Sequence, residues 1–422
     1  MIYFSFINSI LWILVIIIMI FISFYLTIKF KGIQFRIFKM IKYLFNKKDN
    51  NNEINSFKTL MLTLAGKVGV GSISGIALAI YLAGPGTIFW IWIISLLSIP
   101  IVYAETYLGI KYRERKNNLY NGGPAYYIKN GLKKKKLGYI YSLIIIVSYV
   151  IGFVSIQVNT ISKSIISFIN IRPITIGIIL CVITSFIIFS GIKKVVNVTS
   201  KIVPIMTIIY LLLGILVIIK NIDIIPSAFK IIIDNAFNYK TFGVSFLTTM
   251  IMGIQRGIFS NEAGIGTGSI AASINEDNNI ISSGYIQMFG VYITSFLICT
   301  ITSIIVIISN YEMLNIHDPN GIEIALFSFN YHFGNLGNIL LICLILLFAF
   351  STILSAYYYG EVSLSYLNSN NTLIIRFLLL ITIIIGSIIS SSSIWLFIDI
   401  NMAILAIINM YAIYKLRNDI RT

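Results

Sequence analysis

Long apolar runs separated by short polar segments make up most of this chain. Each run has roughly twenty residues or more, enough for an α-helix to cross the ~30 Å hydrocarbon core of a bilayer. The first run is longer than the ~7–15 residues of a signal-peptide core, so we interpret it as a span. The pattern predicts an all-α polytopic membrane protein with eleven transmembrane helices, at 2–30, 57–82, 87–109, 138–168, 172–191, 199–220, 242–274, 280–309, 337–358, 373–391 and 394–414.

Two of these predicted spans contain residues that a helix surrounded by lipid would exclude. The segment 251–273 carries Arg256 and Glu262 among five glycines, and the segment 64–86 carries Lys67 among glycines and serines. A charge at the bilayer centre costs ~3 kcal/mol, and glycine costs ~1 kcal/mol more than alanine in a helix interior. Non-helical backbone is tolerated at that depth only where protein or water satisfies its polar groups. We therefore predict that both helices are broken midway and that the breaks line a binding site.

The two interrupted helices occupy corresponding positions in the two halves of the chain. Residues 1–56 hold an N-terminal helix and a basic loop, and the interrupted helices are the first and sixth of the ten that follow. Five helices reverse the direction of the chain, so 57–220 and 221–422 are predicted to be inverted repeats of one transport domain. Paired glycine-interrupted helices in such repeats indicate the binding site of a secondary transporter.

Close helix packing is the alternative explanation for the glycines. Gly71 and Gly75, and again Gly253 and Gly257, have the small-xxx-small spacing that lets two helices approach closely. Packing alone does not account for two corresponding segments that each carry charged or polar residues as well. The pattern therefore favours broken helices.

Composition and charge placement agree with a membrane protein. Only 11% of the 422 residues are charged and 58% are hydrophobic, whereas about a quarter of the residues of a soluble protein are charged. The net charge of +16 comes mainly from alternate loops, near 29–58, 111–136 and 193–201, and from the C-terminus. The positive-inside rule makes these loops cytoplasmic, with the N-terminus outside and the C-terminus inside the cell membrane. This topology explains the charge without a nucleic-acid partner.

The chemistry of a broken helix suggests a ligand. The N-terminus of a half-helix presents free N–H groups and a partial positive charge, which suit a carboxylate. The C-terminus and the unwound carbonyls suit Na⁺. A zwitterionic amino acid together with a cation would match such a site.

Both interrupted segments resemble the alanine/glycine:cation symporter family, a branch of the LeuT-type transporters. GVGSISGIALAI at 69–80 and AGPGTIFWIW at 83–92 follow the family pattern around the first break. RGIFSNEAGIG at 256–266 follows the longer, more specific pattern R-G-x-F-S-N-E-A-G-x-G, and 122–128 and 347–361 also match. The resemblance implies a LeuT-type 5+5 inverted repeat after the first helix. It also implies Na⁺-coupled import of a small neutral amino acid by alternating access, and a transporter rather than an enzyme.

The predicted substrate site draws on both breaks and two further helices. Gly69, Gly71 and Ser72 would offer N–H groups and a hydroxyl to the substrate carboxylate. Phe259 would face the substrate side chain, although an aromatic at such a position often just packs in the core. The full set is Gly69, Gly71, Ser72, Gln157, Asn159, Gly257, Phe259, Ser260, Asn261 and Ala356.

Gln157 and Asn159 are amides on a predicted membrane helix. They would reach the amino group of the substrate, or they form interhelical hydrogen bonds worth ~0.6 kcal/mol each. The LeuT-type resemblance implies that Ser351 and Thr352 hold Na⁺ with carbonyls near Lys67 and Val68. The alternative for each hydroxyl is a bond back to its own helix. H⁺ coupling, or none, stays open beside Na⁺.

Four charged residues are assigned structural or gating roles. Glu262 and Arg256 are expected to pair with each other or with Lys67, either as a structural lock or in contact with the ligand. The ammonium of Lys67 is also placed to stand in for a metal ion. Asp399 is expected to act as a gate or as a partner of Lys67, and Glu105 as an interface charge near the cytoplasmic end of its helix.

The sequence departs from the commoner family form at three positions. Ser72, Ala125 and Ala356 stand where Asn, Met and Trp are usual. If that Trp encloses a small side chain, Ala356 enlarges the pocket and favours a larger neutral amino acid such as glutamine, with serine as another candidate.

Two other function classes are alternatives to a transporter. A membrane-embedded enzyme needs a nucleophile–base pair or a metal set, and the sequence shows neither; His317 and His332 both fall in a predicted extracellular loop. An amino-acid-sensing receptor would bind without turnover, and counterflow exchange distinguishes it from a carrier. The sequence carries no signal for the oligomeric state.

Overall fold

The computed structural model describes residues 2–45, 54–116, 119–237, 246–277, 279–314, 320–367, 371–389 and 391–422. His317 and the first residues of the span predicted at 242–274 lie outside this part of the chain. Nearly all described residues are helical, as the apolar runs predict.

The described part of the chain consists of helices and one short β-hairpin. The α-helices are α1 (Ile2–Lys29), α2 (Ile37–Phe45), α3 (Ser56–Lys67), α4 (Ser74–Ala83), α5 (Thr87–Lys111), α6 (Pro124–Asn130), α7 (Lys135–Ile145), α8 (Val154–Ile166), α9 (Pro173–Ile188), α10 (Ile192–Lys220), α11 (Ile225–Phe237), α12 (Phe246–Asn261), α13 (Thr267–Ser273), α14 (Ile280–Val291), α15 (Thr300–Ile308), α16 (Gly321–Phe333), α17 (Asn335–Tyr366), α18 (Leu373–Gly386) and α19 (Ser391–Lys415). The 3₁₀ turns are η1 (Ile33–Phe35), η2 (Val70–Ser72), η6 (Tyr311–Met313) and η7 (Arg417–Asp419), and the π-helical segments are η3 (Ile146–Phe153) and η5 (Tyr292–Cys299). Strands β1 (Glu114–Lys116) and β2 (Leu119–Asn121) pair antiparallel, with Arg115 opposite Tyr120.

Within the described residues, seven helices are long and apolar enough to cross a membrane. The bent pair formed by α3 and η2–α4 makes an eighth candidate. The predicted spans at 172–191 and 373–391 contain α9 and α18, which are shorter apolar helices, and α12 and α13 are separate short helices. The structure therefore confirms a polytopic helical protein, and the count of eleven stays a prediction.

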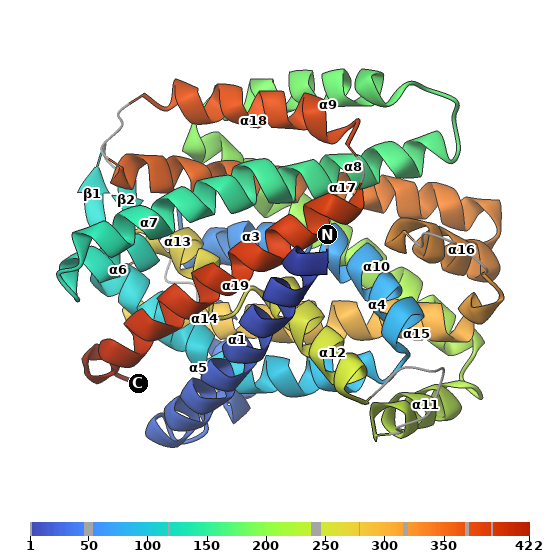
Figure 1. Cartoon of the computed structure of the whole chain (residues 1–422), viewed down its shortest axis with the longest axis horizontal. Helices are drawn as coiled ribbons and strands as arrows, with labels where there is room; N and C mark the ends of the chain where they lie inside the picture. The colour runs from blue at the N-terminus through green and yellow to red at the C-terminus, as the bar shows by residue number, and fades with distance from the viewer. Residues whose placement is uncertain are drawn as a thin grey trace.

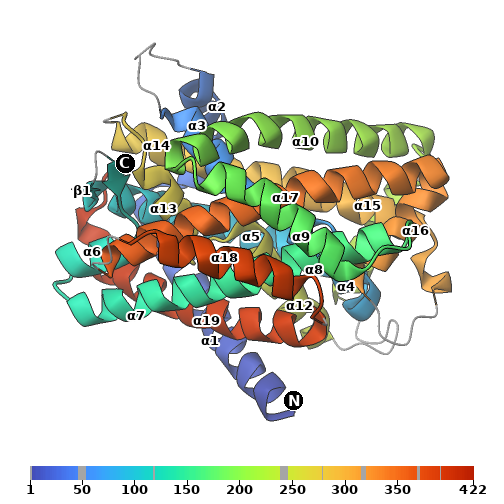
Figure 2. The same ribbon diagram turned by 90° about the horizontal axis from the view of Figure 1, so that it is seen from above.

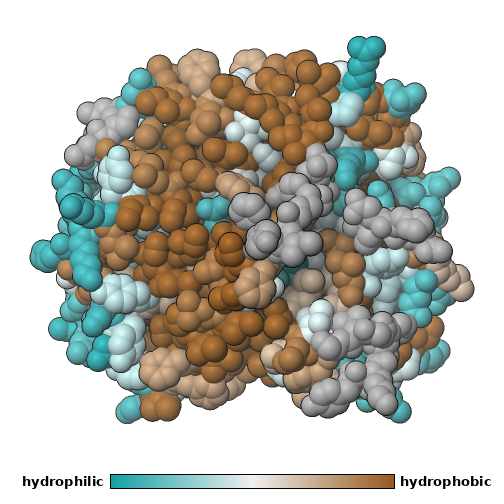
Figure 3. Space-filling view, viewed as in Figure 1, coloured by the Kyte–Doolittle hydropathy of each residue, from teal (hydrophilic) through white to brown (hydrophobic). Residues whose placement is uncertain are grey.

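The surface carries the apolar belt of a membrane protein. Hydrophobic residues cover the middle of the molecule, and hydrophilic residues gather at its two ends, where the β1–β2 hairpin and α16 lie (Figures 1 and 3). Large side chains point outward from this belt, among them Phe186 on α9, Ile219 on α10 and Phe377 on α18, which are 73%, 63% and 56% exposed. An apolar surface of this size requires lipid around it.

The first predicted break is present. Helix α3 begins after Asn55, whose side chain accepts a hydrogen bond from the backbone N–H of Lys58 at 3.0 Å, and it ends at Lys67. The backbone is extended at Gly69, turns through η2, and becomes helical again at Ser74. The two half-helices meet at an angle of 64°.

The second interruption lies between α12 and α13. Helix α12 ends at Asn261, and Glu262, Gly264 and Gly266 then take the left-handed backbone conformation, with φ of 51°, 80° and 101°. Glycine adopts this conformation freely, whereas a residue with a side chain adopts it at a cost of ~1–2 kcal/mol. Helix α13 begins at Thr267 and contacts α3, α5 and α17, so the second break lies beside the first in the interior (Figures 1 and 2).

Close helix packing also explains some of the glycines. The interrupted segments therefore contain glycines at the breaks and glycines that let two helices approach each other. A Cβ on Gly253 of α12 would lie 2.4 Å from the carbonyl oxygen of Thr87 and 2.7 Å from the Cβ of Trp90, both at the start of α5. Gly257, one turn later, faces Ile94 of α5, with a Cβ 2.6 Å from its side chain. These glycines bring α12 against α5.

We expect Gly253→Ala to destabilise the folded protein, because the added methyl group meets backbone that cannot move aside. Overpacking of this kind costs about 1–3 kcal/mol. The apparent melting temperature in detergent should therefore fall. Gly75→Ala is the matched control, since its Cβ would lie 3.7 Å from Trp395 in ordinary contact. Equal melting temperatures for the two variants would contradict the packing described here.

Candidate functional site

The turn η2 of the first break lies between α12 and α17. A Cβ on Gly71 would lie 2.4 Å from the ring of Phe259 on α12, so the ring rests directly on the backbone of Gly71. A Cβ on Gly69 would lie 2.5 Å from the Oγ1 of Thr352 on α17. The structure thus brings together four of the predicted site residues, and any side chain at either glycine would fill the space between the helices.

A side chain from the third core helix satisfies the unwound backbone. The N–H of Val70 donates to the Oε1 of Gln157 on α8 at 3.1 Å, and Gln157 is buried. The Nε2 of Gln157 would lie 3.2 Å from a Cβ on Gly69. Gln157 therefore reaches the break, where it already satisfies one of the N–H groups that a helix interruption leaves free.

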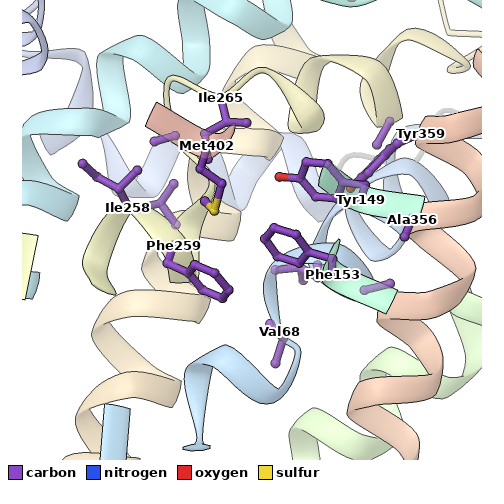
Figure 4. Packing of buried hydrophobic residues seen from close by; sticks show 14 of the residues in the cluster. Val68, Tyr149, Phe153, Ile258, Phe259, Ile265, Ala356, Tyr359 and Met402 are labelled. Carbon is purple, nitrogen blue, oxygen red and sulfur yellow. The ribbon is translucent and has the colours of Figure 1, made fainter. Parts of the chain in front are cut away.

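Aromatic rings pack against one another beside the break and form an aromatic wall there. Tyr149 stacks on Phe153 with ring centroids 4.4 Å apart, and Phe153 stacks on Phe259 at 5.0 Å. Trp395 of α19 lies 5.1 Å from Phe259 on its other side. In Figure 4 the rings of Phe153 and Phe259 point toward one another above Val68.

The sequence analysis did not identify Tyr149, Phe153 or Trp395. Tyr149 and Phe153 belong to η3, a π-helical segment of the kind that occurs frequently at functional sites. Their spacing of four residues in a predicted span was a usable signal, because it places two aromatic rings on one face of a helix. Trp395 left no local signal of this kind.

The predicted polar residues of the breaks are buried and bonded within the protein. Ser72 donates its hydroxyl to the carbonyl of Lys67 at 3.2 Å. Ser260 donates back to Gly257 in its own helix at 2.9 Å. The amide of Asn261 donates to Ser95 of α5 at 3.0 Å, and its Oδ1 accepts from the N–H of Ala263 at 2.9 Å. Ser260 and Asn261 therefore stabilise the end of α12 in this conformation.

The two remaining predicted substrate contacts lie on α8 and α17. Asn159 donates its amide to the carbonyl of Ile389, just beyond α18, so this group joins two helices, which is the alternative predicted for it. Ala356 is 1% exposed on α17, which packs against η3 (Figure 4).

Oxygen atoms converge where α3 ends beside α17. The Oγ1 of Thr352 lies 2.8 Å from the carbonyl oxygen of Ala65 and 2.9 Å from that of Phe348. Ser351 donates to Phe348 at 2.9 Å, and Val68 follows the last residue of α3. Carbonyls at the end of a half-helix together with hydroxyls form the kind of donor set that holds Na⁺ in transporters.

An ion pair lies against the aromatic wall. The Nη2 of Arg256 on α12 is 3.7 Å from the Oδ2 of Asp399 on α19, and both side chains are buried. The guanidinium lies 4.7 Å above the ring of Trp395 and 5.7 Å above that of Phe259. The predicted pairing of Asp399 with Lys67 is therefore wrong, because Asp399 lies on the side of the site where Arg256 is its partner.

Glu262 holds the second break through hydroxyl groups. Its Oε1 accepts from Tyr149 at 2.9 Å and its Oε2 from Thr267 at 2.6 Å. Among the described residues it makes no direct ion pair with Arg256, whose partner is Asp399. Lys67 acts on Glu262 electrostatically without a direct bond, so that pairing stays a prediction. Thr267 opens α13, where a carboxylate benefits from the positive end of the helix dipole. These contacts compensate for the left-handed backbone of Glu262.

Glu105 is not an interface charge. It is fully buried on α5, and its Oε2 accepts from the amide of Asn409 on α19 at 3.1 Å. The same amide group donates to the carbonyl of Gly264 in the second break at 2.9 Å.

The chain matches the family model described as the sodium:alanine symporter family over residues 2–422. It is 34% identical over 398 residues to the amino-acid carrier protein AlsT of Bacillus subtilis, covering 93% of this chain and 85% of that one. It is 34% identical over 418 residues to the probable sodium/glutamine symporter GlnT of the same organism, covering 97% and 87%. With the sodium/alanine symporter AgcS of Methanococcus maripaludis it shares 33% over 338 residues, covering 78% and 74%.

Solved structures with a similar fold are also transporters. A Na⁺-coupled sialic acid symporter in a substrate-bound outward-open state superposes with a TM-score of 0.57 at 15% identity, covering 96% of this chain and 82% of that one. MhsT in complex with L-phenylalanine superposes with a TM-score of 0.56 at 13% sequence identity, covering 85% of this chain and 88% of that one. At such identities the likeness concerns the fold alone, and it agrees with the predicted LeuT-type architecture.

The family pattern recognised at the two breaks, the match along the chain and the similar fold agree with one another. The predicted resemblance is confirmed, and this chain belongs to the sodium:alanine symporter family.

Proposed function

We propose that this member of the family imports a small neutral amino acid of the alanine/glycine class together with Na⁺, by alternating access. Na⁺-coupled amino-acid transport is the activity of the family. The observation that carries the choice of a small substrate is the contact of the Phe259 ring with the backbone of Gly71. It leaves little room for a side chain between the two breaks.

The substrate carboxylate binds the N–H groups of the first break at Gly69, Gly71 and Ser72. N–H groups at the start of a half-helix favour an anion. In this conformation the N–H of Ser72 bonds to the carbonyl of Gly69 at 3.2 Å and the ring of Phe259 rests on Gly71, so the carboxylate displaces both contacts when it binds. The substrate side chain lies against Phe259 and Phe153, which suits a methyl group or a hydrogen. Gln157, already bonded to η2, turns its amide toward the substrate.

The proposed Na⁺ site lies where α3 ends on α17. Ser351 and Thr352 supply hydroxyl oxygens, and the carbonyls around Ala65 and Val68 supply the rest. The hydrogen bond of 2.8 Å from the hydroxyl of Thr352 to the carbonyl of Ala65 supports this, because it places two oxygen ligands side by side, and Na⁺ would take the place of the hydroxyl proton between them. Binding there ties the first break to α17.

The proposed topology has eleven spans, with an N-terminal helix in 1–56 and inverted repeats in 57–220 and 221–422. The N-terminus lies outside and the C-terminus in the cytoplasm of a cell enclosed by this membrane. The corresponding positions of the two breaks support the repeats. The pair of Arg256 and Asp399 over the aromatic wall closes the route to one side of the site, and its separation would open that route.

A carrier for a larger neutral amino acid, such as glutamine or serine, is the second candidate. Two observations favour it: Ala356 stands in the buried wall of α17, and a relative at 34% identity is named a probable sodium/glutamine symporter. H⁺ in place of Na⁺ is the alternative coupling ion, and a relative is named a putative sodium/proton-dependent alanine carrier.

Uptake by the purified protein in proteoliposomes tests the proposal. We expect an inward Na⁺ gradient to drive accumulation of labelled alanine or glycine above that of serine and glutamine, and a Na⁺ ionophore to abolish it. Counterflow of labelled against unlabelled alanine should also occur, which a receptor without turnover would not support. No gradient-driven uptake of any of the four amino acids contradicts the proposal.

Thr352→Val should weaken Na⁺ binding, because it removes one oxygen ligand at unchanged shape. A bond to a charged group is worth about 1.5–3 kcal/mol, so the Na⁺ concentration for half-maximal uptake should rise about tenfold or more. Thr382→Val is the matched control, since that hydroxyl bonds back to Leu378 within α18. An unchanged Na⁺ dependence in Thr352→Val would exclude this site.

Ala356→Trp should narrow the range of substrates, because the indole would project from α17 toward η3 and the aromatic wall and reduce the room for a substrate side chain. One pocket contact discriminates between side chains by about 1–3 kcal/mol, so the ratio of glutamine to alanine uptake should fall about tenfold or more. Ala356→Val, which adds less volume, should give an intermediate ratio. A ratio equal to that of the wild type in both variants removes Ala356 from the pocket.

A further inference from the structure

Three charged residues lie between the two breaks and take no part in the proposed substrate and Na⁺ sites. Lys67 ends α3, Glu105 lies on α5 and Glu262 follows α12, and the three are at most 2% exposed. Buried charges at membrane depth are costly and usually mark a functional element.

One oxygen of Glu105 is held firmly and the other is not. Its Oε2 accepts from Asn409, which in turn is bonded to Gly264 and to the hydroxyl of Tyr127. The backbone of Gly264 also acts on this carboxyl group as a hydrogen-bond donor. The Oε1 of Glu105 is buried and makes no hydrogen bond of regular geometry within the described part of the chain. The carboxyl group is thus positioned beside the second break with one unused oxygen.

The unused oxygen and the ammonium of Lys67 are aimed at the same place. The Nζ of Lys67 also lacks a hydrogen-bond partner among the described residues. A Cβ on Gly268 of α13 would lie 3.6 Å from both that Nζ and the Oε1 of Glu105. The two groups flank Gly268 without forming a direct bond, so each is only partly compensated by the other.

The charges of this group do not balance. Glu262 accepts two hydroxyl hydrogen bonds and lies at the start of α13, and these contacts stabilise its charge against the cost of burial. The titratable groups that act electrostatically on Glu105 are Lys67, Glu262, Tyr127 and Tyr141. With one ammonium and two carboxylates all ionised, the group carries one excess negative charge, which costs several kcal/mol in a buried site.

A proton neutralises the excess negative charge of this group better than a metal ion would. A cation such as Na⁺ needs several oxygen ligands, and here one free carboxylate oxygen faces a positively charged ammonium. A proton needs only that oxygen, and a neutral carboxyl group tolerates burial at much lower cost than an unpaired carboxylate.

We propose that Glu105 is the proton-binding site of this carrier, protonated in the conformation described here. The inference rests on the proposed transport function. Lys67 is attached to the first break, and Gly268 to the second, so a relative movement of the breaks changes the distance between Lys67 and Glu105. When the ammonium moves onto the carboxyl group, the O–H bond breaks, the proton leaves to water, and a Lys67–Glu105 ion pair replaces it. One proton is exchanged in each transport cycle.

The test measures proton movement and amino-acid uptake in the same proteoliposomes. With an inward Na⁺ gradient and alanine, a trapped pH dye should report H⁺ movement in fixed proportion to alanine uptake by the wild type. Glu105→Gln should keep Na⁺-driven uptake, lose the H⁺ movement and become insensitive to external pH. Glu361→Gln, which changes another largely buried carboxyl group with an unpartnered oxygen, should behave as the wild type.

Two outcomes overturn the assignment: alanine uptake by the wild type without H⁺ movement, and undiminished H⁺ movement in Glu105→Gln. Absence of uptake of any amino acid by the wild type contradicts the proposed function instead, so the two failures are distinguishable. Infrared spectroscopy gives a readout independent of transport. The wild-type minus Glu105→Gln difference spectrum should contain the band of a protonated carboxyl, and its absence at neutral pH also overturns the assignment. Glu105→Asp, which keeps the carboxyl group, should restore H⁺ movement.

Discussion

The structure depends on satisfying backbone groups that two interrupted helices expose in the middle of an apolar protein. An unpaired N–H or carbonyl at that depth costs several kcal/mol. The N–H of Val70 is satisfied by Gln157 from α8, and the carbonyl of Ala65 by Thr352 from α17. The side chains that hold the break are therefore also those that ligands would contact. A site built in this way is stable when empty and exchanges its internal bonds for bonds to substrate and ion.

Two separate contacts link the two breaks, one through an aromatic ring and one around a buried carboxyl group. Phe259 rests on Gly71, so the breaks touch through a ring and a backbone. Lys67 and Gly268 bring the ends of the breaks together around Glu105. Movement of one half-helix must alter both contacts, because helix α3 and helix α13 also pack against each other. This gives a physical link between the proposed substrate site at the aromatic wall and the charged group formed by Lys67, Glu105 and Glu262.

The interior charges differ in how completely they are paired. Arg256 has Asp399 and two aromatic rings, and Glu262 has two hydroxyls. Arg256 and Asp399 each keep a polar atom without a hydrogen-bond partner in the described part of the chain, and so do Lys67 and Glu105. Lys67 and Glu105 lie between elements that alternating access would move. Incompletely paired charges add little to the stability of a single conformation. They therefore allow the two breaks to adopt two alternative arrangements, which a carrier requires.

The sequence by itself determined the membrane class, the two interruptions and the family. Run length fixes a span, because the bilayer has a set thickness, and glycines beside charges mark a break wherever they occur in a span. The motif at 256–266 identified the family because it is long and local. The pairing of Asp399 with Arg256, the burial of Glu105 and the stacking of Phe153 and Trp395 on the site were decided only by the tertiary structure. These contacts join residues far apart in the chain, and which side chains meet there depends on how the helices pack.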